Sequence, residues 1–61
     1  QLRAEVVQSA RVFRFEEGRW PATLDELVRD GQLQTSTLLT VEELGWSYTL
    51  DDSRDSFRLG A

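Results

Sequence analysis

Three oxygen-bearing side chains in the last third of the chain have the alternate spacing of a calcium-binding loop. Asp51, Ser53 and Asp55 match its first three ligand positions, in which oxygens two residues apart reach one cation. The sixth position of such a loop needs a glycine for its sharp turn, and here it is Ser56. An acidic hairpin turn explains the same cluster. The three residues are therefore an incomplete calcium candidate, and we expect neither a metal site nor a cofactor.

Two pairs of adjacent carboxylates, Glu16-Glu17 and Glu42-Glu43, are the other candidates for chemistry. Neighbouring side chains on a helix point about 100° apart, whereas acid/base work on glycosides needs two carboxyl groups facing each other across a cleft. The chain has no His and no Cys, and its seven basic residues are all Arg. No Ser or Thr therefore has a His or Lys to activate it. We expect no catalytic residues, and the chain is predicted not to be an enzyme.

The length and the net charge of the chain limit which other functions it can have. Its 61 residues allow one domain, residues 1–61, with a small core. The net charge of −4 disfavours nucleic-acid backbones and anionic membrane surfaces, which select basic proteins. No apolar run approaches the ~18 residues of a membrane-spanning helix. Because position 1 is not Met, we expect the chain to be a piece of a longer protein.

The first element is predicted to be a helix from Leu2 to Glu17. Its apolar positions recur at spacings of four, four and three and place one stripe on one side. This stripe consists of Leu2, Val6, Ala10 and Phe13. Gly18 is placed to end the helix in a left-handed conformation. Phe15 lies off the stripe, as do Val7 and Val12. We expect Phe15 to cover the helix end, and the alternative is that part of this helix is buried against another chain.

A second, two-turn helix is predicted to follow Pro21, which cannot continue the first one. Thr23 and Glu26 form a capping box, in which the hydroxyl accepts from the amide of Glu26 and the carboxylate reaches back to the amide of Thr23. Gly31 ends this helix. Trp20 and Pro21 are predicted to be structural, with Trp20 closing the bottom of the core against the short helix.

The remainder is predicted to contain a loop and a hairpin. Gln32–Thr40 is polar and Thr-rich and is interpreted as a connecting loop. The residues after it, 40–43, repeat the capping-box pattern and could form a single helical turn or a short strand. Apolar residues then alternate over 46–50, beginning with Trp46, and again over 57–59, with an acidic turn between them. The sequence thus predicts an α+β fold, with the hairpin's apolar face on the first helix.

The stretch from Phe13 to Leu33 resembles the globular domain of bacterial type IV pilins and type II secretion pseudopilins. In that family a long N-terminal helix ends in an aromatic residue, a few polar residues, Gly-x-aromatic-Pro and a Leu-Asp-Glu-Leu-type helix. Phe13, Gly18, Trp20-Pro21 and Leu24–Leu27 occupy these positions here. The family's Asp-Pro-Trp-Gly motif and its Cys pair are absent, which favours a minor or divergent member.

The resemblance implies a structural subunit, the periplasmic or extracellular domain of a single-pass inner-membrane protein. Such a subunit would assemble with other pilin-like subunits, identical or different, into a filament or its tip for secretion, adhesion or uptake. It would contact a membrane only through an apolar N-terminal segment that is missing before Gln1. The alternative is a small non-catalytic interaction module of a larger protein, built on the same scaffold.

Four residues of the first helix, which its buried stripe does not need, form the predicted partner surface. These are Val7, Arg11, Val12 and Arg14. A subunit packed side by side through this helix would bury the two valines. The two arginines, together with Arg3, would form ion pairs with acidic groups of a neighbouring subunit. Candidates for these acidic groups are Asp51, Asp52 and Asp55 in the predicted hairpin turn.

Overall fold

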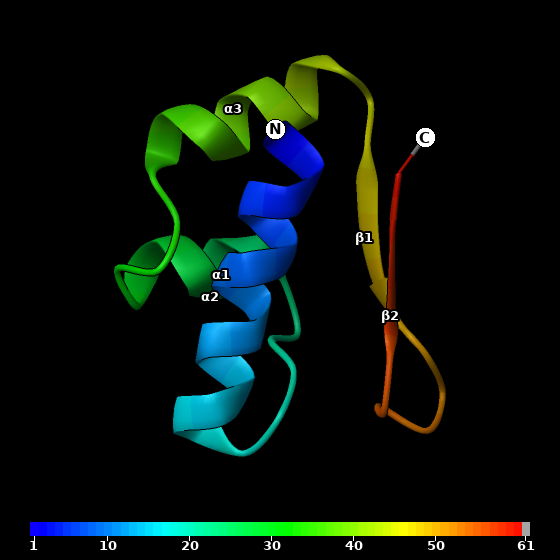
Figure 1. The fold of residues 1–61 in the computed structure, drawn as a ribbon. Coiled ribbons are helices and arrows are strands. Elements are labelled where there is room, and N and C mark those ends of the chain that lie inside the picture. The colour runs from blue at the N-terminus through cyan, green and yellow to red at the C-terminus, as the bar shows by residue number, and fades with distance from the viewer. Residues whose placement is uncertain (61) are drawn as a thin grey trace.

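In residues 1–60, which the computed structural model describes, three helices precede an antiparallel hairpin (Figure 1). The helices are α1 (Leu2–Glu17), α2 (Leu24–Arg29) and α3 (Thr35–Glu43), and the strands are β1 (Ser47–Leu50) and β2 (Phe57–Gly60). In Figure 1, α3 crosses near the first turns of α1, α2 lies behind α1, and the hairpin runs alongside α1. This order of elements confirms the predicted α+β class.

The long helix α1 has the predicted bounds and the predicted buried stripe. Val6, Ala10 and Phe13 are buried in the core. The helix ends at Gly18, which adopts the left-handed conformation (φ 77°) and donates its backbone N–H to the carbonyl of Arg14. A side chain at position 18 would strain this backbone, which is why glycine suits the site.

The short helix α2 begins at the predicted cap. Thr23 accepts a hydrogen bond from the amide of Glu26 at 3.4 Å. The Glu26 carboxylate accepts from the amide of Ala22, one residue before the expected partner, and forms an ion pair with Arg19 at 2.9 Å. The hydrogen bond from Arg19, followed by that from Ala22, lowers the pKa of Glu26 to about 2. Gly31 follows the helix in the left-handed conformation, as predicted for its end.

The third helix corrects the prediction for the middle of the chain. A loop was expected over Gln32–Thr40, followed by a single helical turn or a short strand, but residues Thr35–Glu43 form one continuous helix. The expectation was wrong because the local signals are weak: three of the first six helical residues are threonines, and Gln34 at the N-cap makes no side-chain hydrogen bond.

Contacts with the rest of the chain stabilise α3 instead. Leu38 and Val41 are buried in the core, and the Thr37 hydroxyl donates to the carboxylate of Glu5 on α1 at 2.9 Å. Tertiary packing therefore outweighs the low helix propensity of the segment.

The hairpin has an inner and an outer face, as the alternation predicted. Tyr48 pairs with Leu59 and Leu50 with Phe57, which places these four apolar side chains on one face. Leu59 is buried in the core with residues of α1, so the apolar face packs toward the helices as predicted. Arg3 of α1 also donates a hydrogen bond to the Leu59 carbonyl. Trp46 is half-buried just before β1 and packs against the core.

Trp20 packs against the core, as expected, and its side chain also contacts the hairpin, which was not expected. Its half-buried indole contacts the Phe57 ring edge-on, with 4.9 Å between ring centroids. The indole N–H donates to the carbonyl of Asp55 in the hairpin turn at 2.9 Å. One residue further on, the carbonyl of Pro21 accepts a hydrogen bond from the Tyr48 hydroxyl. The segment between α1 and α2 is thus attached to the hairpin at two points.

Candidate interaction surface

The face of α1 opposite the core is exposed along its whole length. At about 100° per residue, the side chains of Ala4, Gln8, Arg11 and Phe15 lie on one line, directly opposite the buried residues. All four are exposed, and we call them the outer stripe. Phe15 is 91% exposed. The expectation that it covers the helix end is wrong, because its angular position points it away from every other element.

The outer stripe carries no carboxylate, although the chain has a net charge of −4. Glu5 and Glu16 point to another side of α1, where Glu5 accepts from Thr37 and Glu16 accepts from the Gln32 side-chain amide at 2.7 Å. The outer stripe consequently carries one cation, Arg11, and one large apolar side chain, Phe15, in a chain with a net negative charge. This composition favours contact with an acidic surface.

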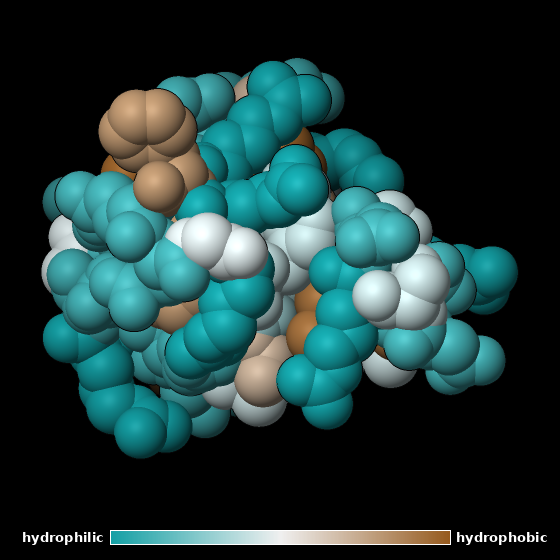
Figure 2. Space-filling view, turned by 90° about the horizontal axis from the view of Figure 1, so that it is seen from below, coloured by the Kyte–Doolittle hydropathy of each residue, from teal (hydrophilic) through white to brown (hydrophobic). Residues whose placement is uncertain are grey.

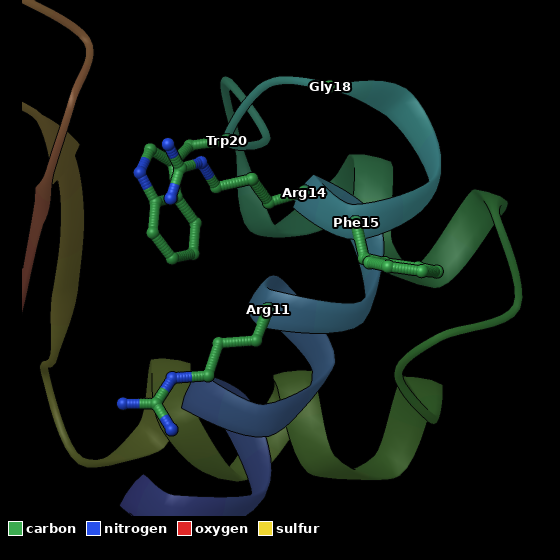
Figure 3. Close-up of a pocket in the computed structure, with 5 residues that line it drawn as sticks. All are labelled: Arg11, Arg14, Phe15, Gly18 and Trp20. Carbon is green, nitrogen blue, oxygen red and sulfur yellow. The ribbon is translucent and has the colours of Figure 1, made fainter.

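A shallow depression of about 600 Å³ lies beside the outer stripe (Figure 3). Its wall is formed by Trp20 and Arg14, whose guanidinium lies 5.0 Å from the centre of the indole ring. Arg11 extends from the next turn of α1, and Phe15 points away from Trp20, as Figure 3 shows. Two cations therefore line the depression: Arg14 is stacked on Trp20, and Arg11 has no ion pair within residues 1–60.

The four residues of the predicted partner surface have different surroundings. Val7 is half-buried and packs against the core, so the monomer already uses it, contrary to our expectation. Arg14 is exposed and stacked on Trp20. Val12 is half-buried, and Arg11 is exposed with no hydrogen bond or ion pair to any residue in 1–60. Of the four, Arg11 is the residue best placed to meet a partner.

Sequence reasoning assigned Phe15 to the wrong role, although the signal for the correct one was present. The period that puts Phe13 in the buried stripe turns Phe15 by about 200°, to the far side of the helix. The intramolecular contacts of Arg3 and Arg14 had no such signal. They depend on where the hairpin and Trp20 lie, which only the tertiary structure gives.

The hairpin turn satisfies its own polar groups. The Ser53 hydroxyl donates to the Asp51 carboxylate at 3.0 Å and accepts from the backbone amide of Asp55 at 3.3 Å. Within residues 1–60 no group of three acidic side chains is arranged to hold a metal ion. These hydrogen bonds link Asp51, Ser53 and Asp55, the calcium candidate, within the hairpin turn.

The face of the molecule seen from below is mostly hydrophilic (Figure 2). Figure 2, seen from below, shows hydrophobic residues standing apart among hydrophilic ones on that face. Besides Phe15, the large apolar side chains exposed in the described part of the chain are Leu39 and Leu44, both at α3. Single exposed apolar residues are ordinary on monomers, and Phe15 differs from the two leucines in being almost fully exposed and in lining the depression beside Arg11.

Comparison with protein-family models, with curated proteins and with solved structures found no match for the chain. Across residues 1–60, none of the helices combines the length and apolar character needed to cross a bilayer.

Proposed function

We propose that the chain is a non-catalytic structural subunit, the extracytoplasmic domain of a minor or divergent pilin- or pseudopilin-like protein. It assembles through its first helix into a filament or its tip, with identical or different pilin-like subunits as partners. The proposal rests first on the resemblance over Phe13–Leu33. The order of elements, a long helix followed by short helices and a hairpin packed on it, is consistent with that resemblance.

The outer stripe of α1 is the observation that carries the proposal. A monomer gains little from an exposed Phe15 one turn away from Arg11, which has no ion pair within residues 1–60, on the carboxylate-free outer stripe. A subunit that packs side by side through this helix buries the ring and pairs the guanidinium. Aromatic and arginine side chains are the residues that dominate such contacts.

The test uses the full-length protein in the organism that encodes it. Reading the coding sequence upstream of Gln1 should reveal a prepilin-type cleavage site followed by about 20 apolar residues. The variants Arg11→Glu and Phe15→Ser should fold normally and reduce the filaments recovered from sheared cell surfaces. Arg58→Glu makes the same charge change on the exposed outer face of β2 and should leave assembly intact.

Two results would contradict the proposal. One is an upstream sequence without an apolar segment, which would favour the non-filament interaction module. The other is undiminished assembly of both α1 variants at normal protein levels, which would place the interface elsewhere.

A further inference from the structure

A second depression, of about 210 Å³, lies between α2, α3 and β1 and draws on no residue of α1. Leu24, Leu38 and Val41 are buried and form an apolar floor. The half-buried Trp46 forms one side of it. We call this depression the Trp46 groove.

Two carboxylates stand at the rim of the Trp46 groove. Asp25 on α2 and Glu42 on α3 are both exposed, and neither side chain forms a hydrogen bond or ion pair with any residue in 1–60. An apolar floor with two free carboxylates suits a side chain that has an apolar stem and a cationic head. Arginine fits best, because its methylenes can cover the floor while its guanidinium pairs with a carboxylate at the rim and stacks on the indole.

The chain itself carries such a group on a different surface. Arg11 on the outer stripe is exposed and unpaired within the described residues, and Phe15 lies one turn further along the same line. The outer stripe has no carboxylate and the Trp46 groove has no cation, so the two surfaces are complementary in charge and in apolar content.

We infer that the Trp46 groove receives the outer stripe of a second copy of the chain, with Arg11 of that copy between Asp25 and Glu42. This inference rests on the proposed function and names the partner surface that the proposal leaves open. The hairpin turn, the acidic site expected from the sequence, is less suitable because Asp51 already accepts from Ser53. Since the stripe and the groove share no residue, the contact is heterologous and each copy can bind one neighbour on either side.

Reciprocal charge reversal tests the inference on the 61-residue chain. Sedimentation equilibrium up to millimolar concentration should show weak self-association of the unaltered chain. In Arg11→Glu the stripe and groove are both acidic, and in Glu42→Arg both carry arginine, so either variant alone should associate about tenfold more weakly. Far-UV circular dichroism should show both variants folded, because both positions are exposed.

Mixing the two variants is the decisive step. The acidic stripe of the Arg11→Glu variant then faces the arginine-bearing groove of the Glu42→Arg variant, and the unaltered stripe and groove face each other at the next contact. The mixture should therefore regain the association that neither variant shows alone. Arg58→Glu leaves both the outer stripe and the Trp46 groove unaltered, so by itself it should associate as strongly as the unaltered chain.

The outcomes separate this inference from the proposed function. A mixture that associates no more than its components, or an unaltered chain that stays monomeric at millimolar concentration, overturns the groove as the partner surface. If Arg11→Glu still abolishes filaments in cells, the proposed function stands without this groove. If the mixture associates but the organism makes no filament, the inference holds and the filament proposal fails.

Discussion

Trp20 makes two contacts with the hairpin and one with Arg14 of α1, and Trp20→Ala removes all three. The indole hydrogen bond to Asp55 contributes about 1 kcal/mol, and the edge-on contact with Phe57 about the same. The stacked Arg14 adds about 0.5 kcal/mol at this exposed position. Because truncating a half-buried ring also removes apolar burial, we expect Trp20→Ala to lower the free energy of unfolding by about 3 kcal/mol in total. That is a large share of the stability available to a domain of this size.

The variants Trp20→Phe and Arg14→Gln separate the contributions of the individual Trp20 contacts to this loss of stability. Trp20→Phe keeps an aromatic ring beside Phe57 and loses the indole N–H, so it should cost about 1 kcal/mol. Arg14→Gln removes only the cation and should cost about 0.5 kcal/mol. In a domain of this size, each kcal/mol lost from the free energy of unfolding lowers Tm by about 4–8 °C. The Trp20→Ala variant should therefore melt about 12–24 °C below the parent.

Thermal unfolding followed by far-UV circular dichroism measures these differences without relying on the fluorescence of the mutated tryptophan. A double-mutant cycle with Phe57→Leu should give a coupling energy of about 1 kcal/mol between the two rings. The reasoning is refuted if Trp20→Ala melts within about 3 °C of the parent. It is also refuted if the effects of Trp20→Ala and Phe57→Leu are additive.

Three further predictions concern single groups. The pKa of Glu26 is lowered from 4.5 to about 2, so its contribution to stability is complete above pH 4.5 and lost as the pH falls to about 2. Glu26→Gln should therefore flatten the acid limb of the stability curve, and an unchanged limb would contradict this. Burial, followed by the charge of Glu26, raises the pKa of Tyr48 to about 12, so its contribution is complete below pH 10 and lost as the pH rises toward 12. Absorbance titration of this sole tyrosine should give the raised value, and Tyr48→Phe should remove the alkaline loss of stability. Calcium at millimolar concentration, and its later chelation, should leave Tm unchanged, and a clear calcium-dependent rise would restore Asp51, Ser53 and Asp55 as ligands.

The helices and strands that were predicted correctly are each marked by a sequence pattern that spans only a few neighbouring residues. The spacing of apolar residues and Gly18 predict α1, and Thr23 predicts where α2 begins. The alternation of apolar residues and the acidic turn predict the hairpin. In contrast, α3 forms without a side-chain cap, and its stability comes from Leu38, Val41 and other contacts distant in sequence. No local pattern encodes such contacts, so the segment was expected to be a loop.

The candidate site was predictable to a similar degree. Helical geometry alone places Arg11 and Phe15 on the outer face of α1. That Arg14 stacks on Trp20, or that Asp25 and Glu42 border one groove, depends on how α2, α3 and the hairpin pack together. Surfaces on one helix can thus be read from the sequence, whereas surfaces shared by several elements cannot.

The hydrogen bond between Arg3 and the Leu59 carbonyl joins residues 56 positions apart in the sequence. Leu59 also fills the core next to residues of α1, and a two-stranded hairpin is only marginally stable by itself. During synthesis, therefore, α1 emerges first but lacks the strand that covers it until nearly all of these residues have left the ribosome. The helix would remain a fluctuating amphipathic segment until then, and its apolar stripe would be open to chaperones.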